Sequence, residues 1–147
     1  MNVAEGIVLE YKLLLPEAHV PTRSRDTDAG HDLYSAEEKL IKPKSGVNIR
    51  TGIAISAPPG YYYTIEGRSS MWQKGIMQFS GIIDGTYTGE LHVGLLNISD
   101  YSFLAKPGDR IAQMIIHKII QGGFNKVDEW SKNYSLRGEA GWGSSGR

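Results

Sequence analysis

The stretch Val47-Asn48-Ile49-Arg50-Thr51-Gly52-Ile53-Ala54-Ile55 alternates apolar side chains with polar or small ones. A period of two places successive side chains on opposite faces of an extended chain, so this stretch predicts a half-buried β-strand. The pattern recurs at 7–13, 61–65 and 91–95, and residues 111–120 form a mostly apolar run. Such a run is typical of a strand that is covered on both faces.

Segments with turn chemistry separate these strands. Proline and glycine are concentrated at 42–46, 57–60 and 105–108, where they favour changes of chain direction. Many short strands joined in this way predict an all-β domain, a distorted jelly roll or β-barrel. Only Ser69 to Lys74 has the pattern of a helix, and Ser69 or Ser70 is the expected N-cap.

The length of 147 residues corresponds to one domain, and its composition changes near the end. We expect residues 1–130 to form the β domain and 131–147, which are polar and rich in glycine, to form a flexible tail. The chain has no cysteine, which excludes disulfides. It shows neither a signal peptide nor a membrane-spanning run, so we expect an intracellular protein, in cytoplasm or nucleus, that does not bind membranes.

The charge balance indicates whether a nucleic-acid partner is expected. Lys plus Arg and Asp plus Glu each number 16, which gives a formal net charge of zero. Proteins that bind a nucleic-acid backbone normally carry a basic excess, so we expect no nucleic-acid partner. The four histidines lack the spacing of metal ligands, and we interpret them as structural or surface residues.

Residues 81–90, Gly-Ile-Ile-Asp-Gly-Thr-Tyr-Thr-Gly-Glu, place a carboxylate, Asp84, directly after two isoleucines and before the aromatic ring of Tyr87. Flanking glycines allow the backbone to approach a ligand closely. A carboxylate held beside a flat ring could orient a water molecule against a sugar or nucleotide. The alternative is a β-hairpin with an ordinary turn aspartate and a half-buried tyrosine.

Four further short motifs accompany residues 81–90, at 29–36, 67–71, 107–114 and 137–146. In this order the five segments resemble the five motifs of the trimeric dUTP pyrophosphatase (dUTPase) family. The resemblance covers residues 28–147, nearly the whole chain. Its most specific elements are Gly-Ile-Ile-Asp at 81–84 and Pro-Gly-Asp-Arg-Ile-Ala-Gln at 107–113.

Residues 141–146 also match the dinucleotide-binding pattern G-x-G-x-x-G, but only Arg147 follows, whereas that motif requires a helix after it. A disordered Gly/Ser tail remains the alternative by composition. A guanidinium suits a terminal phosphate and an indole suits a base. The resemblance implies that Arg137 binds the γ-phosphate and that Trp142, between Gly141 and Gly143, covers the uracil where the family usually has Phe. The tail would thereby close over the active site.

The resemblance also assigns the base and sugar side of the site. Asp84 would position and deprotonate the attacking water, and Tyr87 would lie beneath the deoxyribose, leaving no room for a 2′-hydroxyl. The stretch Gln78 to Ile83 would form a hairpin whose backbone pairs with uracil, with Gln78, Gly81, Ile82 and Ile83 as its binding residues. Thr86 stands where the family generally has an acidic residue.

On the phosphate side, residues 67–70 are either a simple helix cap or a helix N-terminus that binds phosphate. The resemblance implies phosphate contacts from Arg68, Ser69, Ser70, Arg110 and Gln113. It also implies that Asp32 acts on a phosphate-bound Mg²⁺ through water. This chain departs from the family pattern with Gly67 for Pro, Ser70 for Gly, and His31 for the usual aromatic.

The implied protein is a homotrimeric dUTP diphosphatase whose active sites are shared between chains. Water would attack the α-phosphorus of dUTP and release dUMP and pyrophosphate, with Mg²⁺ as cofactor. The reaction would lower dUTP and supply dUMP for thymidylate synthesis. Two alternatives remain: a dCTP deaminase-like enzyme, which shares the fold, and a non-catalytic nucleotide-binding module.

Overall fold

The computed structural model describes residues 6–79 and 81–131, which form ten strands and one helix. In chain order these are β1 (Glu10–Leu13), β2 (His31–Tyr34), β3 (Lys39–Ile41), β4 (Ser45–Ser56), β5 (Tyr61–Glu66), α1 (Ser69–Trp72), β6 (Ile76–Phe79), β7 (Ile82–Asp84), β8 (Glu90–Asn97), β9 (Phe103–Ala105) and β10 (Arg110–Lys118).

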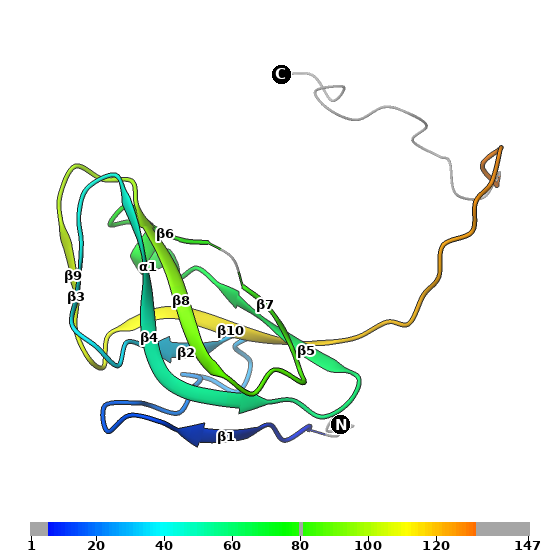
Figure 1. The fold of residues 1–147 in the computed structure, drawn as a ribbon, viewed down its shortest axis with the longest axis horizontal. Coiled ribbons are helices and arrows are strands. Elements are labelled where there is room, and N and C mark those ends of the chain that lie inside the picture. Colours follow the sequence, from blue (N-terminus) through cyan, green and yellow to red (C-terminus); the bar gives the residue numbers. More distant parts are fainter. Residues whose placement is uncertain (1–5, 80, 132–147) are drawn as a thin grey trace.

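The strands form two four-stranded antiparallel sheets, in the orders β1-β4-β8-β6 and β2-β10-β5-β7, and a small pair of β3 with β9. Figure 1 shows β4 and β8 side by side and β10 crossing toward β5 in the second sheet. Neighbours in each sheet are distant in sequence, as expected for a jelly roll. The predicted all-β class with one short helix is therefore confirmed.

The core consists of apolar side chains from both sheets. The largest fully buried ones include Leu33, Ile41, Ile49, Ile53, Tyr63, Leu91, Leu95 and Ile111. The Tyr63 hydroxyl donates a hydrogen bond to the Ile55 carbonyl oxygen at 3.3 Å. Burial raises the pKa of this phenol to about 12, so the ring stays neutral at physiological pH.

The strand predicted from the opening stretch is present as β4, but its alternation does not continue to the end. Residues 51–55 are all buried. The pairing of β4 with β8 shifts between Arg50 and Ala54, which marks a bulge, and Gly52 within it has a φ of +66°. The extra residues of the bulge interrupt the alternation, and this segment is buried on both faces. The expected strand at 7–13 is shorter and covers only Glu10–Leu13.

The predicted helix is a single turn, Ser69–Trp72, and the expected N-cap was wrong. Arg68 holds the N-cap position with an extended backbone, and no side chain caps this helix within the described residues. The Arg68 carbonyl oxygen accepts the N–H groups of both Met71 and Trp72 at 3.0 Å. The helix therefore begins one residue earlier than serine capping would place it.

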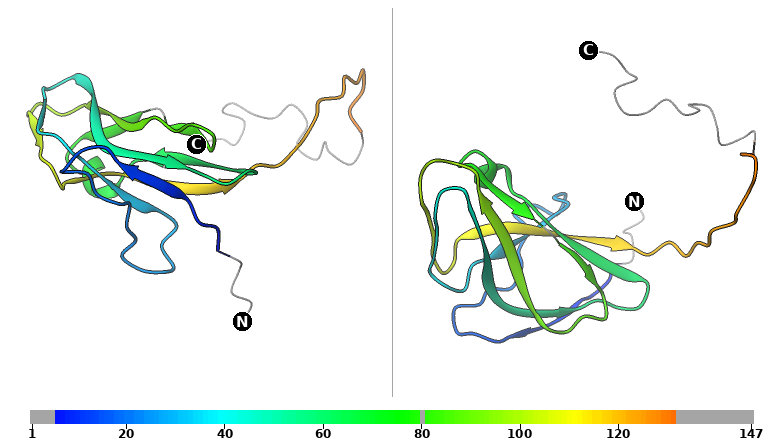
Figure 2. Two further views of the ribbon diagram at one scale, coloured as in Figure 1. Left: turned by 60° about the horizontal axis from the view of Figure 1, so that its bottom comes forward. Right: turned by 45° about the horizontal axis from the view of Figure 1, so that its top comes forward.

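The chain leaves the body of the protein after β10 (Figures 1 and 2). We call residues 119–131 the exit segment. Its apolar side chains are exposed, namely Ile119, Ile120, Phe124, Val127 and Trp130. The predicted tail boundary falls at the end of this segment, and residues 132–147 lie outside the described part of the chain. No helix of the described residues is long and apolar enough to cross a membrane.

Candidate active site

A pocket of about 440 Å³ opens where β2, β10 and the start of α1 meet. Because β2 and β5 both pair with β10, their ends come together although they are far apart in sequence. The pocket is lined by Ser24, Asp28, Ala29, Gly30, Asp32, Arg68, Ser69, Ser70, Gln113 and Ile115. The predicted phosphate-side residues therefore gather in one place, except Arg110, which borders the pocket through Asp32.

The carboxylate of Asp32 lies between two guanidinium groups. Arg68 Nε lies 2.8 Å from Oδ1, and Arg110 Nη1 lies 3.6 Å from Oδ2. The Asp32 side chain is only 14% exposed, whereas that of Arg110 is 50% exposed. A shielded carboxylate in a short ion pair orients its partner more strongly than an exposed carboxylate does. Asp32 therefore holds both cations at the edge of the pocket.

Arg68 also connects the other parts of this pocket. Its Nη1 donates to the Ser70 hydroxyl at 3.3 Å and to the Arg110 carbonyl oxygen at 3.2 Å. The serine that replaces the family glycine is thus a hydrogen-bond partner of the arginine beside it. Ser69 and Ser70 are exposed to the pocket, and the first N–H groups of a helix have no acceptor within the helix.

Gln113 braces the pocket from β10. Its Nε2 donates to the Gly67 carbonyl oxygen at 2.8 Å. On the other side, a Cβ added to Gly30 would lie 2.3 Å from Gln113 Oε1, so the Gln113 side chain packs closely against Gly30. Gln113 therefore fixes the spacing between β2 and the loop that precedes α1.

The second group of predicted residues lies around β7. Asp84 ends this strand, is exposed, and pairs in register with Tyr62 on β5. The Tyr87 N–H donates to the Asp84 carbonyl oxygen at 2.9 Å, which closes a tight turn. The Tyr87 ring is 47% exposed. Asp84 and Tyr87 are therefore held on one turn, and both are accessible to a ligand.

The segment from Gln78 to Ile83 differs from the predicted hairpin. Gln78 belongs to β6, which pairs with β8, whereas Ile82 and Ile83 belong to β7, which pairs with β5. The Gly81 carbonyl oxygen accepts the Ile65 N–H at 2.7 Å and draws the chain across to the second sheet. Gly81 has a φ of +143°, and an added Cβ would lie 2.5 Å from the Ile65 carbonyl oxygen.

The side chains of this segment face different surroundings. Ile82 is 78% exposed, whereas Ile83 packs against the core. The Gln78 amide lies beside Gly81, where an added Cβ would be 3.0 Å from Nε2. Ile82 is therefore accessible to a ligand, and Ile83 anchors the segment to the core.

The pocket beside Asp32 and the Asp84 turn are far apart within one chain. Asp32 pairs with Gln113, Gln113 with Glu66, and Asp84 with Tyr62, so the two aspartates differ by three strand spacings and four residues along β5. Strand spacings of ~4.8 Å and a rise of ~3.3 Å per residue give about 20 Å between their Cα atoms. A triphosphate is much shorter than this distance.

The pocket contains carboxylates of the kind that bind Mg²⁺. Among the described residues, no three His, Cys, Asp or Glu side chains converge as a metal site. Mg²⁺ commonly binds through one or two carboxylates together with substrate phosphates and water. The pocket offers Asp32 and Asp28 beside Arg68, Ser69 and Ser70. These residues fit a magnesium ion that arrives with a triphosphate.

Ser24 and Asp28 line the pocket but were not among the predicted site residues. Asp28 Oδ2 accepts the Arg25 N–H at 3.0 Å, which holds the loop in place. A second acidic residue just before Ala29-Gly30 was the available signal for Asp28. The predicted tail residues Arg137, Gly141, Trp142 and Gly143 lie outside the described residues.

The dUTPase family model matches residues 16–146 of this chain. The chain belongs to the dUTPase family. The dUTPase of Candida albicans, a deoxyuridine 5′-triphosphate nucleotidohydrolase, is 37% identical over 140 residues, covering 95% of this chain and 88% of the relative.

Solved dUTPase structures share the fold. A variant of the Staphylococcus bacteriophage 80alpha enzyme with dUpNHpp gives a TM-score of 0.86 at 31% identity, covering 95% of this chain and 99% of the other. A variant from phage phi11 of S. aureus, in which a structural Mg(II) ion is coordinated, gives 0.77 at 27% identity, with coverages of 84% and 98%.

Proposed function

We propose that this dUTPase-family protein hydrolyses dUTP to dUMP and pyrophosphate by attack of water on the α-phosphorus. The observation that supports this most is the composition of the pocket, where cations, hydroxyls and a carboxylate meet from separate segments. Membership of the family and the exposed Asp84 turn support the same reaction.

In this proposal Asp84 is the general base that deprotonates the attacking water. Tyr87 lies beneath the deoxyribose, and the segment of Gln78, Gly81, Ile82 and Ile83 binds uracil. Arg68, Ser69, Ser70, Arg110 and Gln113 hold the phosphates, and the tail adds Arg137, Gly141, Trp142 and Gly143. Fixed cations and donors stabilise the charge that develops on the phosphate oxygens during phosphoryl transfer.

We further propose Mg²⁺ as the cofactor, held by the triphosphate with Asp32 contacting it through water. When bound, the ion neutralises phosphate charge. The Asp32 carboxylate already pairs with Arg68 and Arg110, so the same group orients both cations around the triphosphate. The phage phi11 relative also coordinates Mg(II), as a structural ion.

We propose a homotrimer in which each active site draws on more than one chain. The separation of about 20 Å between Asp32 and Asp84 supports this, because a general base acts at a hydrogen-bond distance of ~3 Å from its target. The exposed apolar side chains of the exit segment also favour burial against another chain. Closed threefold symmetry would repeat the shared site three times.

The deciding experiment measures pyrophosphate release from dUTP beside dTTP, dCTP and UTP. We expect turnover of dUTP with strong discrimination against the other three. Release of ammonia from dCTP would instead identify a deaminase. Tight binding of the dUTP analogue without pyrophosphate release would indicate a non-catalytic binding module.

A further inference from the structure

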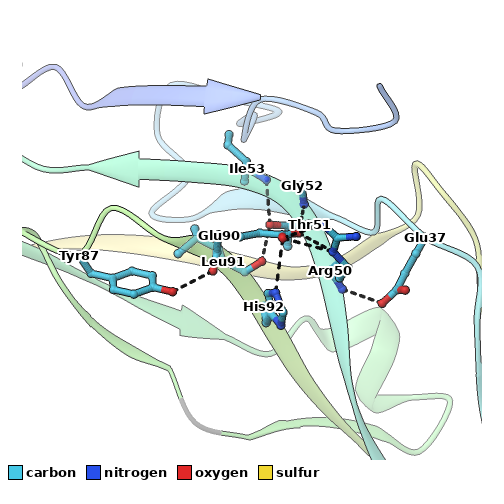
Figure 3. Close-up of polar contacts among 9 residues, drawn as sticks. All are labelled: Glu37, Arg50, Thr51, Gly52, Ile53, Tyr87, Glu90, Leu91 and His92. Carbon is cyan, nitrogen blue, oxygen red and sulfur yellow. Dashed lines mark hydrogen bonds and ion pairs between the residues drawn. The ribbon is translucent and has the colours of Figure 1, made fainter. Parts of the chain in front are cut away.

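The carboxylate of Glu90 lies where β4 and β8 lose their register (Figure 3). Arg50 pairs with His92 and Ala54 pairs with Glu90, so the chain between Arg50 and Ala54 bulges out of the ladder. A bulge leaves backbone groups without ladder partners. Here the Gly52 N–H donates to Glu90 Oε1 at 3.0 Å, so the carboxylate supplies the missing acceptor.

The Arg50 guanidinium holds the same carboxylate from the other side. Its Nε donates to Oε1 at 3.1 Å and its Nη2 donates to Oε2 at 2.9 Å. The Glu90 side chain is only 16% exposed. A two-bond pair of arginine with a shielded carboxylate is directional, unlike an exposed ion pair. His92 Nε2 lies 3.6 Å from Oε2 and completes the cluster. Glu90 is therefore fixed in one orientation.

The main chain of Glu90 in turn contacts the ring proposed to lie beneath the sugar. The Tyr87 hydroxyl donates to the Glu90 carbonyl oxygen at 3.2 Å. The ring folds back so closely that a Cβ on Gly89 would lie 2.4 Å from the Tyr87 hydroxyl oxygen. Figure 3 shows Tyr87 and Arg50 contacting Glu90 from different sides. The tilt of the ring therefore depends on where β8 begins, and the Glu90 carboxylate fixes that point.

We propose that Glu90 is a positioning residue for the Tyr87 ring and that, together with Arg50, it sets the discrimination between deoxyribose and ribose. This inference rests on the proposed function, in which the ring leaves no space for a 2′-hydroxyl. Exclusion of an added group by contact requires a wall that does not yield. A ring that is free to tilt admits the ribose of UTP.

The test compares kcat/KM for dUTP and for UTP. Glu90→Gln keeps an acceptor for the Gly52 N–H and removes the charge pair, whereas Glu90→Ala removes both. We expect the dUTP-to-UTP ratio to fall roughly tenfold in Glu90→Ala, because displacement of the residue-90 carbonyl oxygen weakens its bond with the Tyr87 hydroxyl, and to fall less in Glu90→Gln. Asp100→Ala breaks an exposed ion pair with Lys44 and serves as the control, with an unchanged ratio.

Tyr87→Phe removes the hydroxyl contact directly and should lower the ratio by a similar factor. Because both changes act through one contact, the double variant Glu90→Gln/Tyr87→Phe should lower the ratio no further than Tyr87→Phe alone. Glu90 variants that lose thermal stability but keep the wild-type ratio would overturn the inference, as would additive effects in the double variant. A wild-type protein without dUTP turnover would refute the proposed function, and the inference with it.

Discussion

Arg68 and Asp32 are paired at 2.8 Å in the pocket between β2 and α1, although they come from α1's N-cap position and from β2. Both side chains are largely shielded, with exposures of 24% and 14%. A shielded pair loses more when one partner is removed than an exposed pair does, because the other charge is left without compensation. The Arg68 guanidinium is thus held in place without a bound phosphate.

Asp32→Asn should raise the Mg²⁺ concentration needed for half-maximal activity and lower turnover. The amide removes the charge that orients Arg68 and Arg110 and that would face the metal. We expect a loss of at least about tenfold in kcat/KM, the effect of ~1.4 kcal/mol, which is close to the lower end for an interaction with a charged group. Asp100→Asn, which weakens an exposed ion pair, should leave the Mg²⁺ titration unchanged. An unaltered titration in Asp32→Asn would remove Asp32 from the metal site.

Asp84→Asn should retain the fold and the binding of a non-hydrolysable dUTP analogue while turnover falls by ~10²–10⁴, the usual contribution of a positioned general base. Single-turnover kinetics together with analogue binding would separate the two effects. Thr86→Ala, at the neighbouring exposed position of the same turn, is the matched control and should keep wild-type turnover. Near-normal turnover of Asp84→Asn would contradict the proposed role.

Shared sites predict rescue between two inactive variants. Asp84→Asn protein and protein truncated after Tyr134 are unfolded and refolded together in equal amounts. Random assembly makes three-quarters of trimers mixed, and each mixed trimer has one site with both the base and the tail, so roughly a quarter of wild-type activity should return. A refolded mixture no more active than its parents would refute the sharing of base and tail between chains.

Gly85→Ala should destabilise the protein and displace the Asp84 turn. An added Cβ would lie 2.3 Å from the Tyr61 carbonyl oxygen, a backbone atom that cannot move aside cheaply. We expect a loss of about 1–3 kcal/mol in the free energy of unfolding, measured by denaturant titration. Gly46→Ala is the control, because its added Cβ would meet its nearest neighbours at an ordinary 3.6 Å. Equal stabilities of the two variants would contradict this packing argument.

The Glu90 cluster predicts a pH dependence of stability. The hydrogen bond from Arg50 lowers the pKa of the Glu90 carboxyl below its ordinary value of 4.5. A carboxyl with a lowered folded-state pKa contributes stability that is complete above its unfolded pKa and is lost as the pH falls through the folded pKa. The difference in unfolding free energy between wild type and Glu90→Gln should therefore be constant near neutrality and shrink in acid. A difference that does not change with pH would contradict the linkage.

The sequence by itself determined the class of the fold and predicted the residues of the candidate site. Period-two alternation and turn chemistry are local properties, and they predicted β4, β5 and β8. The motifs also predicted which chemical groups lie together in the pocket, because Asp32, Ser69 and Gln113 belong to recognisable motifs. Alternation failed at residues 51–55, because a bulge depends on how the partner strand is paired.

Only the tertiary structure decided which groups touch. The pairs Asp32–Arg68, Gln113–Gly67 and Glu90–Arg50 join segments that are distant in the chain, and no local pattern specifies such contacts. The same holds for β6 and β7, which entered different sheets because Gly81 bonds to Ile65 on β5. Local propensities fix the conformation of each segment, whereas the packing of two sheets around one core fixes which side chains meet.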